Sequence, residues 1–309
     1  MPTSRPDTSA QTCVAPFSAG RERTTVAVPA GACDCHIHVY DARYPAVPGA
    51  RLTPPDATVA DYRKVQQRMR TQRAVFVTPS TYGTDNRPML AALAAFSQEA
   101  GTPGRGVAVV DAGIPDTELQ AMHAAGVRGI RVNLSLGSVP GVAQMLPLAE
   151  RIGALGWHVQ LLAPAATLLA LEETLWRLPV PLVLDHFARI VPATFANDPA
   201  HTLVLRLLGE GRAWIKLSGG YIVTEQGPPL YADVAPLARS YLRAAPDRVV
   251  WGSDWPHASA TAGHQPLPDD ALQMTRLAEW PGDSTLLRRV LVDNPARLYG
   301  FPLMSKETP

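Results

Sequence analysis

The 309-residue chain lacks a long apolar run, a cluster of basic residues and a cysteine framework. No apolar run approaches the ~20 residues that cross a bilayer, and the formal net charge is only +1. We therefore expect neither nucleic acid nor a membrane among its partners. Three cysteines, at positions 13, 33 and 35, are too few for a disulfide-stapled fold and indicate a cytoplasmic protein with reduced thiols.

The opening segment also lacks the apolar centre that a secretory signal carries. We expect residues 1–31 to form a flexible N-terminal extension, residues 32–303 a single catalytic domain and residues 304–309 a tail. An extension that wraps across the domain or a partner is the alternative. The pattern predicts no particular oligomeric state.

A glycine-rich phosphate loop is missing after the first strand, which argues against an open dinucleotide-binding sheet. Short apolar strands instead alternate with helical patterns along the whole chain. The predicted strands are 33–39, 73–78, 105–110, 127–133, 157–162, 180–185, 213–218 and 248–253. The predicted helices are 58–71, 86–100, 116–125, 141–155, 164–176, 198–209, 231–245 and 284–292. Eight such pairs predict an α/β fold, the (β/α)8 TIM barrel, whose active site lies at the carboxyl ends of the strands. The long segments 40–57 and 255–270 are candidates for covering that site.

Two histidines, His36 and His38, are separated by one residue in the first predicted strand. Side chains alternate faces along a strand, so both imidazoles point the same way. Such a pair is typical of a site that binds a metal or polarises a carbonyl, although it also occurs as a structural pair in half-buried strands. Later strand ends add His186 and Asp254, and several titratable groups at strand ends favour the functional interpretation.

These motifs resemble those of the amidohydrolase superfamily, in particular the amidohydrolase-2 branch that contains pyrone dicarboxylate and sugar-acid lactonases. The resemblance covers Ala32 to Phe301, and Trp251-Gly252-Ser253-Asp254-Trp255-Pro256-His257 is its most specific part. The other matching motifs lie at 34–38, 78–86, 129–133, 185–189 and 293–301. The resemblance implies a lactonase, a hydrolase that acts on cyclic carboxylic esters.

Metal-dependent members of the superfamily generally use a carboxylated lysine at the end of strand four and a histidine at the end of strand five. Here strand four ends without a lysine, and His158 lies near the start of strand five, which favours a structural role. The related lactonases work without metal, and Arg131 and Arg189 in the same pocket would repel a divalent cation. We therefore expect no cofactor. The alternative is one zinc ion held by His36, His38, His186 and Asp254.

In a metal-free reaction Asp254 activates a water molecule as general base. His36, His38 and His186 then donate hydrogen bonds to the lactone carbonyl oxygen as it gains negative charge. We expect His257 to orient Asp254 or to contact the substrate, and a loop histidine that caps local backbone is the alternative.

The arginines predict a small anionic lactone as substrate, because a guanidinium forks onto a carboxylate. Arg131 and Arg189 are the expected carboxylate ligands, whereas Arg128 is expected at the opposite end of the barrel. The further substrate-binding candidates are Ser80, Thr81, Tyr82 and Asn133. Dicarboxylate lactonases of this type carry additional basic residues after strands four and seven, where this chain has none, so we expect a monocarboxylated lactone.

Three other functions fit the same residues. A lactone isomerase would move the ring ester between hydroxyl groups without releasing a proton. A zinc-dependent hydrolase or decarboxylase would contain tightly bound zinc. A non-catalytic binding protein would not need His36, His38, His186 and Asp254 together.

Overall fold

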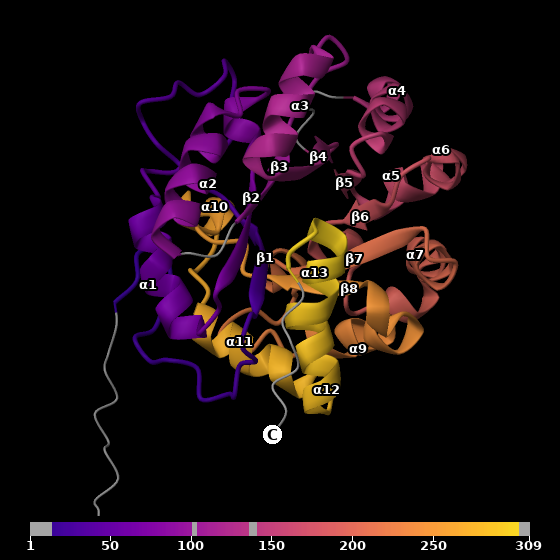
Figure 1. Cartoon of the computed structure of the whole chain (residues 1–309). Helices are drawn as coiled ribbons and strands as arrows, with labels where there is room; N and C mark the ends of the chain where they lie inside the picture. The colour runs from indigo at the N-terminus through magenta and orange to yellow at the C-terminus, as the bar shows by residue number, and fades with distance from the viewer. Residues whose placement is uncertain (1–13, 101–103, 136–140, 303–309) are drawn as a thin grey trace, which may run out of the picture.

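The computed structural model describes residues 14–100, 104–135 and 141–302, in which eight strands are surrounded by helices (Figure 1). Each strand is parallel to the next, and the order in the sheet follows the chain. The strands are β1 (Cys33–Ile37), β2 (Arg73–Val77), β3 (Arg105–Ala108), β4 (Val127–Asn133), β5 (His158–Leu162), β6 (Leu182–Leu184), β7 (Ala213–Ser218) and β8 (Val249–Gly252). All eight predicted strands are therefore present, most of them one to three residues shorter than expected.

The sheet closes between β1 and β8 just beyond the strand ends. The amide of Asp254 donates a hydrogen bond to the carbonyl of His36 at 2.9 Å, and the amide of His38 donates to the carbonyl of Trp255 at 2.8 Å. These bonds join the last strand to the first, so the predicted (β/α)8 barrel is confirmed.

Each predicted helical stretch contains a helix, but the structure divides two of these stretches and adds further helices. The stretch 164–176 forms two short helices, α5 and α6, and the stretch 284–292 forms α12 followed by a π-helix over Arg289–Asp293. Helices α8, α10, α11 and α13 were not predicted. Asp269 caps α11 by accepting hydrogen bonds from the amides of Ala271 and Leu272. No helix in the described ranges is long and apolar enough to cross a membrane. The helices are α1 (Val59–Met69), α2 (Arg87–Ala100), α3 (Asp116–Ala125), α4 (Val142–Gly153), α5 (Ala165–Ala170), α6 (Glu172–Arg177), α7 (Pro199–Gly209), α8 (Gly220–Val223), α9 (Val234–Ala244), α10 (Ala258–Thr261), α11 (Asp270–Glu279), α12 (Ser284–Arg288) and α13 (Asn294–Tyr299).

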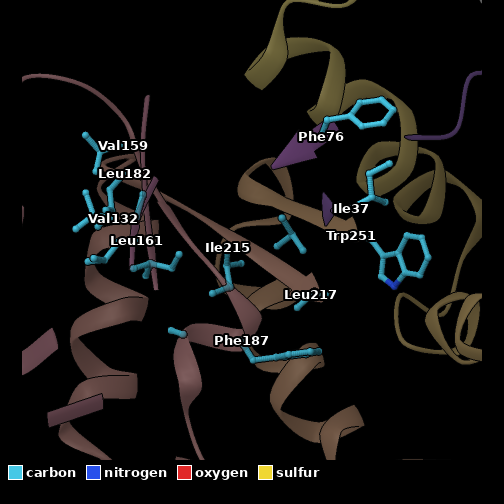
Figure 2. Close-up of a cluster of buried hydrophobic side chains, with 14 of the residues drawn as sticks. Ile37, Phe76, Val132, Val159, Leu161, Leu182, Phe187, Ile215, Leu217 and Trp251 are labelled. Carbon is cyan, nitrogen blue, oxygen red and sulfur yellow. The ribbon is translucent and has the colours of Figure 1, made fainter. Parts of the chain in front are cut away.

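The apolar core has two parts because side chains alternate along each strand. On β2, Phe76 points outward and meets Phe96 of α2 at 5.2 Å between ring centroids. Figure 2 shows Phe76 with other residues of this outer cluster, which fills the space between barrel and helices. The neighbouring Val75 belongs to a second cluster together with Cys33 and Tyr299 of α13. That cluster fills the barrel interior, so the barrel is a packed core rather than a pore.

Residues 16–22 contact α1 and the loop after β8, which favours the alternative of an extension that wraps across the domain. Trp255 donates from its indole nitrogen to the carbonyl of Pro16 at 2.9 Å. Arg68 of α1, which is fully buried, donates to the carbonyls of Ala19 and Glu22 at 2.8 and 3.0 Å and to Asp269 at 2.6 Å. The predicted flexibility of residues 1–13 and the predicted tail 304–309 lie outside the described residues.

We expect Arg68→Met to release segment 14–24 and to lower the free energy of unfolding by about 3 kcal/mol, because it removes one partner of a buried ion pair. Urea unfolding gives the energy, and limited proteolysis reports on the segment. Arg43→Met is the matched control, because the Arg43 side chain is 82% exposed in its pair with Asp41 and such pairs contribute less than about 1 kcal/mol. Equal stability and equal proteolysis of the two variants would contradict the inference that the buried Arg68 holds segment 14–24 in place.

Candidate functional site

Three histidines and one aspartate meet at the carboxyl ends of β1, β6 and β8. The Nε2 atoms of His36, His38 and His186 lie 3.5, 3.6 and 3.8 Å from Oδ1 of Asp254. His36 and His38 also face each other, with their Nε2 atoms 3.3 Å apart. The fold thus brings together all four residues that the sequence analysis assigned to chemistry.

His38 has a fixed proton position. Its Nδ1 lies 2.7 Å from the carbonyl oxygen of Val77, and a carbonyl only accepts hydrogen bonds, so Nδ1 carries a proton. Neutral His38 therefore presents a lone pair, and not a proton, from Nε2. The prediction was that all three histidines donate to a substrate carbonyl, but neutral His38 cannot donate from Nε2.

His186 stands on an unusual stretch of backbone. The φ angles of residues 186–189 are all positive, between 48° and 57°, a conformation that costs non-glycine residues free energy and occurs preferentially at functional sites. Tyr241 supports the stretch by donating to the carbonyl of Phe187 at 3.0 Å. Nδ1 of His186 meets the hydroxyl of Ser218 at 3.0 Å, and this hydroxyl can either donate or accept.

Asp254 is buried and remains ionised. Burial alone would raise its pKa, but His186, His38 and His36 outweigh burial and hold the pKa below its ordinary value. The hydroxyl of Tyr221 donates to Oδ2 at 2.6 Å, which leaves Oδ1 toward the histidines. Sequence reasoning missed Tyr221, because it lies in the short helix α8 outside any recognised motif.

A buried charge cluster lies directly behind His36. Oδ2 of Asp185 accepts hydrogen bonds from Nε of Arg131 and Nε2 of Gln160, both at 3.1 Å. Its Oδ1 lies 3.3 Å from Nδ1 of His36 and 3.7 Å from the ammonium of Lys216. Burial alone would raise the pKa of Asp185, but these neighbours hold it well below its ordinary value. Burial also holds the pKa of His36 well below its ordinary value, so this imidazole is neutral.

Lys216 was missed by the sequence analysis, although a signal was present. It is a charged residue in the otherwise apolar run Ala213-Trp214-Ile215-Lys216-Leu217, and a lysine is almost never fully buried without a partner.

A cavity of about 420 Å³ opens beside these groups. His38, His186 and Asp254 line it, whereas the fully buried His36 does not. Of the predicted substrate ligands, those that line the cavity are Ser80, Thr81, Arg131, Asn133 and Arg189. The predicted covering loop 40–57 contributes residues 47–52, including Arg51, a guanidinium that the sequence analysis did not consider.

Two predicted substrate ligands lie elsewhere. The hydroxyl of Tyr82 accepts from the amide of Asp41 at 2.8 Å and anchors the loop after β1. His257 is buried behind Tyr221, with its Nε2 3.2 Å from Asp270 of α11. Neither residue lines the cavity, so both act at most through their neighbours.

Three residues of the centre fit a divalent cation by spacing, because one ligand atom from each of His36, His38 and Asp254 lies within 4.8 Å of the other two. A tetrahedral zinc ion with bonds of about 2.0–2.1 Å has ligand atoms roughly 3.3–3.5 Å apart, close to the 3.3, 3.5 and 3.6 Å observed among Nε2 of His36, Nε2 of His38 and Oδ1 of Asp254. His186 lies 3.8 Å from Asp254 but does not complete a set of four mutually close ligand atoms. His158 is not part of this centre, because it lies at the base of the barrel against Tyr299, with ring centroids 5.4 Å apart.

Comparisons with known proteins agree with this architecture. A family model described as Amidohydrolase matches residues 33–301. A 2-pyrone-4,6-dicarboxylate hydrolase of Comamonas testosteroni is 34% identical, with 88% of this chain and 91% of that protein covered. A D-galactarolactone isomerase of Agrobacterium fabrum is 32% identical over 88% of this chain and 92% of that protein. A solved apo structure from Agrobacterium tumefaciens superposes with a TM-score of 0.79 at 30% identity and covers 90% of this chain and 98% of that one.

We expect His257→Gln to change how stability depends on pH. Burial alone would lower the pKa of His257, but Asp270 outweighs burial and raises it. The folded protein therefore holds this proton more tightly than the unfolded chain, whose pKa is about 6.5. The resulting stabilisation is complete below about pH 6.5 and is lost as pH rises through the raised pKa.

Urea unfolding at a series of pH values from 5.5 to 8.5 measures this effect. His257→Gln and Asp270→Asn should both lack the wild-type component that fades with rising pH. A wild-type pH profile in either variant would show that the pair does not share a proton.

Proposed function

Because this chain belongs to the amidohydrolase family, we propose that it is a hydrolase that opens a carboxylated lactone without a metal ion. The observation that carries the proposal is Asp254, whose Oδ1 faces three imidazole nitrogens within 3.8 Å at the wall of an arginine-lined cavity. Similarity to a lactone hydrolase and a lactone isomerase over most of the chain supports a lactone as the substrate class.

Asp254 acts as the general base. Tyr221 occupies Oδ2, so Oδ1 is the oxygen that takes a proton from a water molecule in the cavity. The water oxygen forms a bond with the lactone carbonyl carbon, the ring C–O bond breaks, and the departing ring oxygen takes up the proton. A carboxylate with a lowered pKa is a weak base. An ester is nevertheless an easier substrate than an amide, because its leaving oxygen departs more readily than an amine.

The carbonyl oxygen needs hydrogen-bond donors as it becomes negative. His186 is suited to this role, because it lines the cavity and Ser218 can donate to its Nδ1 and leave the proton on Nε2. His38 lines the cavity beside it, and His36 lies one layer deeper. We assign the carbonyl polarisation to His186, with His36 and His38 acting as positioning residues around Asp254.

Arginines at the cavity wall select an anionic substrate. Arg189 has no carboxylate partner within the described ranges, whereas Arg131 commits its Nε to Asp185 but has two further guanidinium nitrogens. Arg51 adds a third guanidinium from the covering loop. We propose a monocarboxylated lactone, with Arg189 and Arg131 as carboxylate ligands. Arg51 is the residue that could pair with a second carboxylate.

A zinc-dependent hydrolase is the second candidate, and the mutual spacing of the ligand atoms of His36, His38 and Asp254 favours it. His36, His38, His186 and Asp254 would hold the ion, which would act as a Lewis acid on the lactone carbonyl. The arginines would bind the substrate carboxylate in the same way.

The first test measures proton release from mono- and dicarboxylated lactones in the presence of a chelator. We expect Asp254→Asn to reduce the rate by about 10²–10⁴-fold, because it removes the general base, and wild type to be indifferent to the chelator. Lactone consumption without proton release would indicate an isomerase instead. Activity that the chelator abolishes and zinc restores would favour the zinc-dependent candidate.

We also expect Arg189→Gln to lower kcat/KM for carboxylated lactones by roughly 10- to 100-fold, because a charged hydrogen bond contributes about 1.5–3 kcal/mol. The rate with an uncharged lactone should change little. Arg128→Gln is the control, because Arg128 lies at the opposite end of β4 and donates to the carbonyls of His123 and Val127. An equal loss on charged and uncharged lactones would remove Arg189 from carboxylate recognition.

A further inference from the structure

Lys216 points into the barrel interior from β7 and is fully buried. Its ammonium donates to the carbonyl of Cys35 at 2.9 Å and to Oε1 of Gln160 at 2.7 Å. The third contact is with Nδ1 of His36 at 3.4 Å. A buried ammonium is costly unless it is paired and fully hydrogen-bonded, and these contacts leave no proton of Lys216 pointing into an apolar space.

The contact with His36 fixes a direction of donation. Nδ1 of His36 lies 3.4 Å from this ammonium and 3.3 Å from Oδ1 of Asp185, but only the contact with Lys216 has hydrogen-bond geometry. A lysine ammonium has three donors and no acceptor, so Nδ1 presents its lone pair. The proton of the neutral imidazole then lies on Nε2, which faces Nε2 of His38 at 3.3 Å and Oδ1 of Asp254 at 3.5 Å. Both atoms are acceptors, because His38 already donates from Nδ1 to Val77. Every donor from Lys216 through His36 to His38 therefore meets an acceptor.

We propose that Lys216 is a positioning residue that holds His36 as the Nε2–H tautomer and thereby keeps divalent cations out of the histidine–aspartate centre. A metal ligand must offer a lone pair, and His36 in this tautomer offers a proton instead. The positive charge of Lys216 adds repulsion in a buried environment, where charges are poorly screened. The inference deepens the proposed function, because it gives a structural cause for metal independence.

The opposite tautomer has a partner ready. Oδ1 of Asp185 has no hydrogen-bond donor in the described structure, yet it lies 3.3 Å from Nδ1 of His36. In wild type the charge of Lys216, 3.7 Å away, balances this oxygen. Without the ammonium, a proton on Nδ1 of His36 would satisfy Asp185 and turn the Nε2 lone pair toward the centre. A histidine oriented by a carboxylate is the usual arrangement around a bound metal.

The test is zinc binding to the folded, chelator-treated protein, measured by competition with a chromophoric chelator. We expect Lys216→Met to bind one zinc ion roughly 10- to 100-fold more tightly than wild type, the range associated with groups that orient metal ligands. Adding His36→Gln to that variant should remove the gain. Equal affinity of wild type and Lys216→Met, or a wild type that is purified with one tightly bound zinc, would overturn the proposal.

Gln160→Leu is the matched control. It breaks a hydrogen bond to Lys216 and one to Asp185 but leaves the ammonium beside His36. We expect its zinc affinity to stay near that of wild type. If the zinc affinity of Gln160→Leu rose as much as that of Lys216→Met, any disruption of the cluster would allow zinc to bind. That result would contradict a specific role for Lys216.

A measurement on wild type keeps the proposal testable if Lys216→Met does not fold. Nitrogen-15 NMR distinguishes the two tautomers of a neutral histidine, and the His36 signals are identified by their loss in His36→Gln. We expect the proton on Nε2, and a proton on Nδ1 would contradict the proposal. Neither experiment uses a lactone, so they succeed or fail independently of the lactonase assay.

Discussion

The closure of the barrel between its first and last strands is the constraint on which the site depends. His36 and His38 precede Asp254 by more than two hundred residues, and two backbone hydrogen bonds across the closure, 2.9 and 2.8 Å long, bring them together. Asp34 reinforces the same seam, because its carboxylate accepts from the amide and hydroxyl of Ser253 at 2.9 and 2.6 Å. A barrel that failed to close here would separate Asp254 from His36 and His38.

The interior of the barrel changes character along its axis. At the amino-terminal end of the strands it is apolar, with Cys33 and Val75 packed against Tyr299. Toward the carboxyl ends it contains Asp185 and Lys216, both fully buried. Buried charges weaken a core unless each has a partner, so the cluster is better explained by what it does for His36 than by stability. The packing at the apolar end offsets the free-energy cost of burying these charges at the other end.

The cavity is lined by residues from strand ends and from loops. Asp254 and His186 are fixed by backbone closure and by a supported left-handed turn. Arg51 instead comes from the long segment after β1. Loop residues such as Arg51 can therefore change by substitution while Asp254 and the imidazoles stay in place.

The sequence by itself determined the fold and the four central residues. Strand periodicity and the positions of His36, His38, His186 and Asp254 at strand ends depend on local pattern, which a single chain displays directly. Helix α11 was not predicted, although its buried residues Ala271, Met274 and Leu277 recur at helical spacing.

Only the tertiary structure decided which side chains touch. The pairing of Lys216 with His36 joins β7 to β1, and the pairing of Tyr221 with Asp254 joins α8 to the loop after β8. Such contacts depend on strand register and barrel closure, which no local pattern encodes. The same reason explains why His257 and Tyr82 lie outside the cavity, although both belong to motifs shared with the amidohydrolase superfamily. A motif fixes a residue's place along the chain, and packing fixes the direction in which its side chain points.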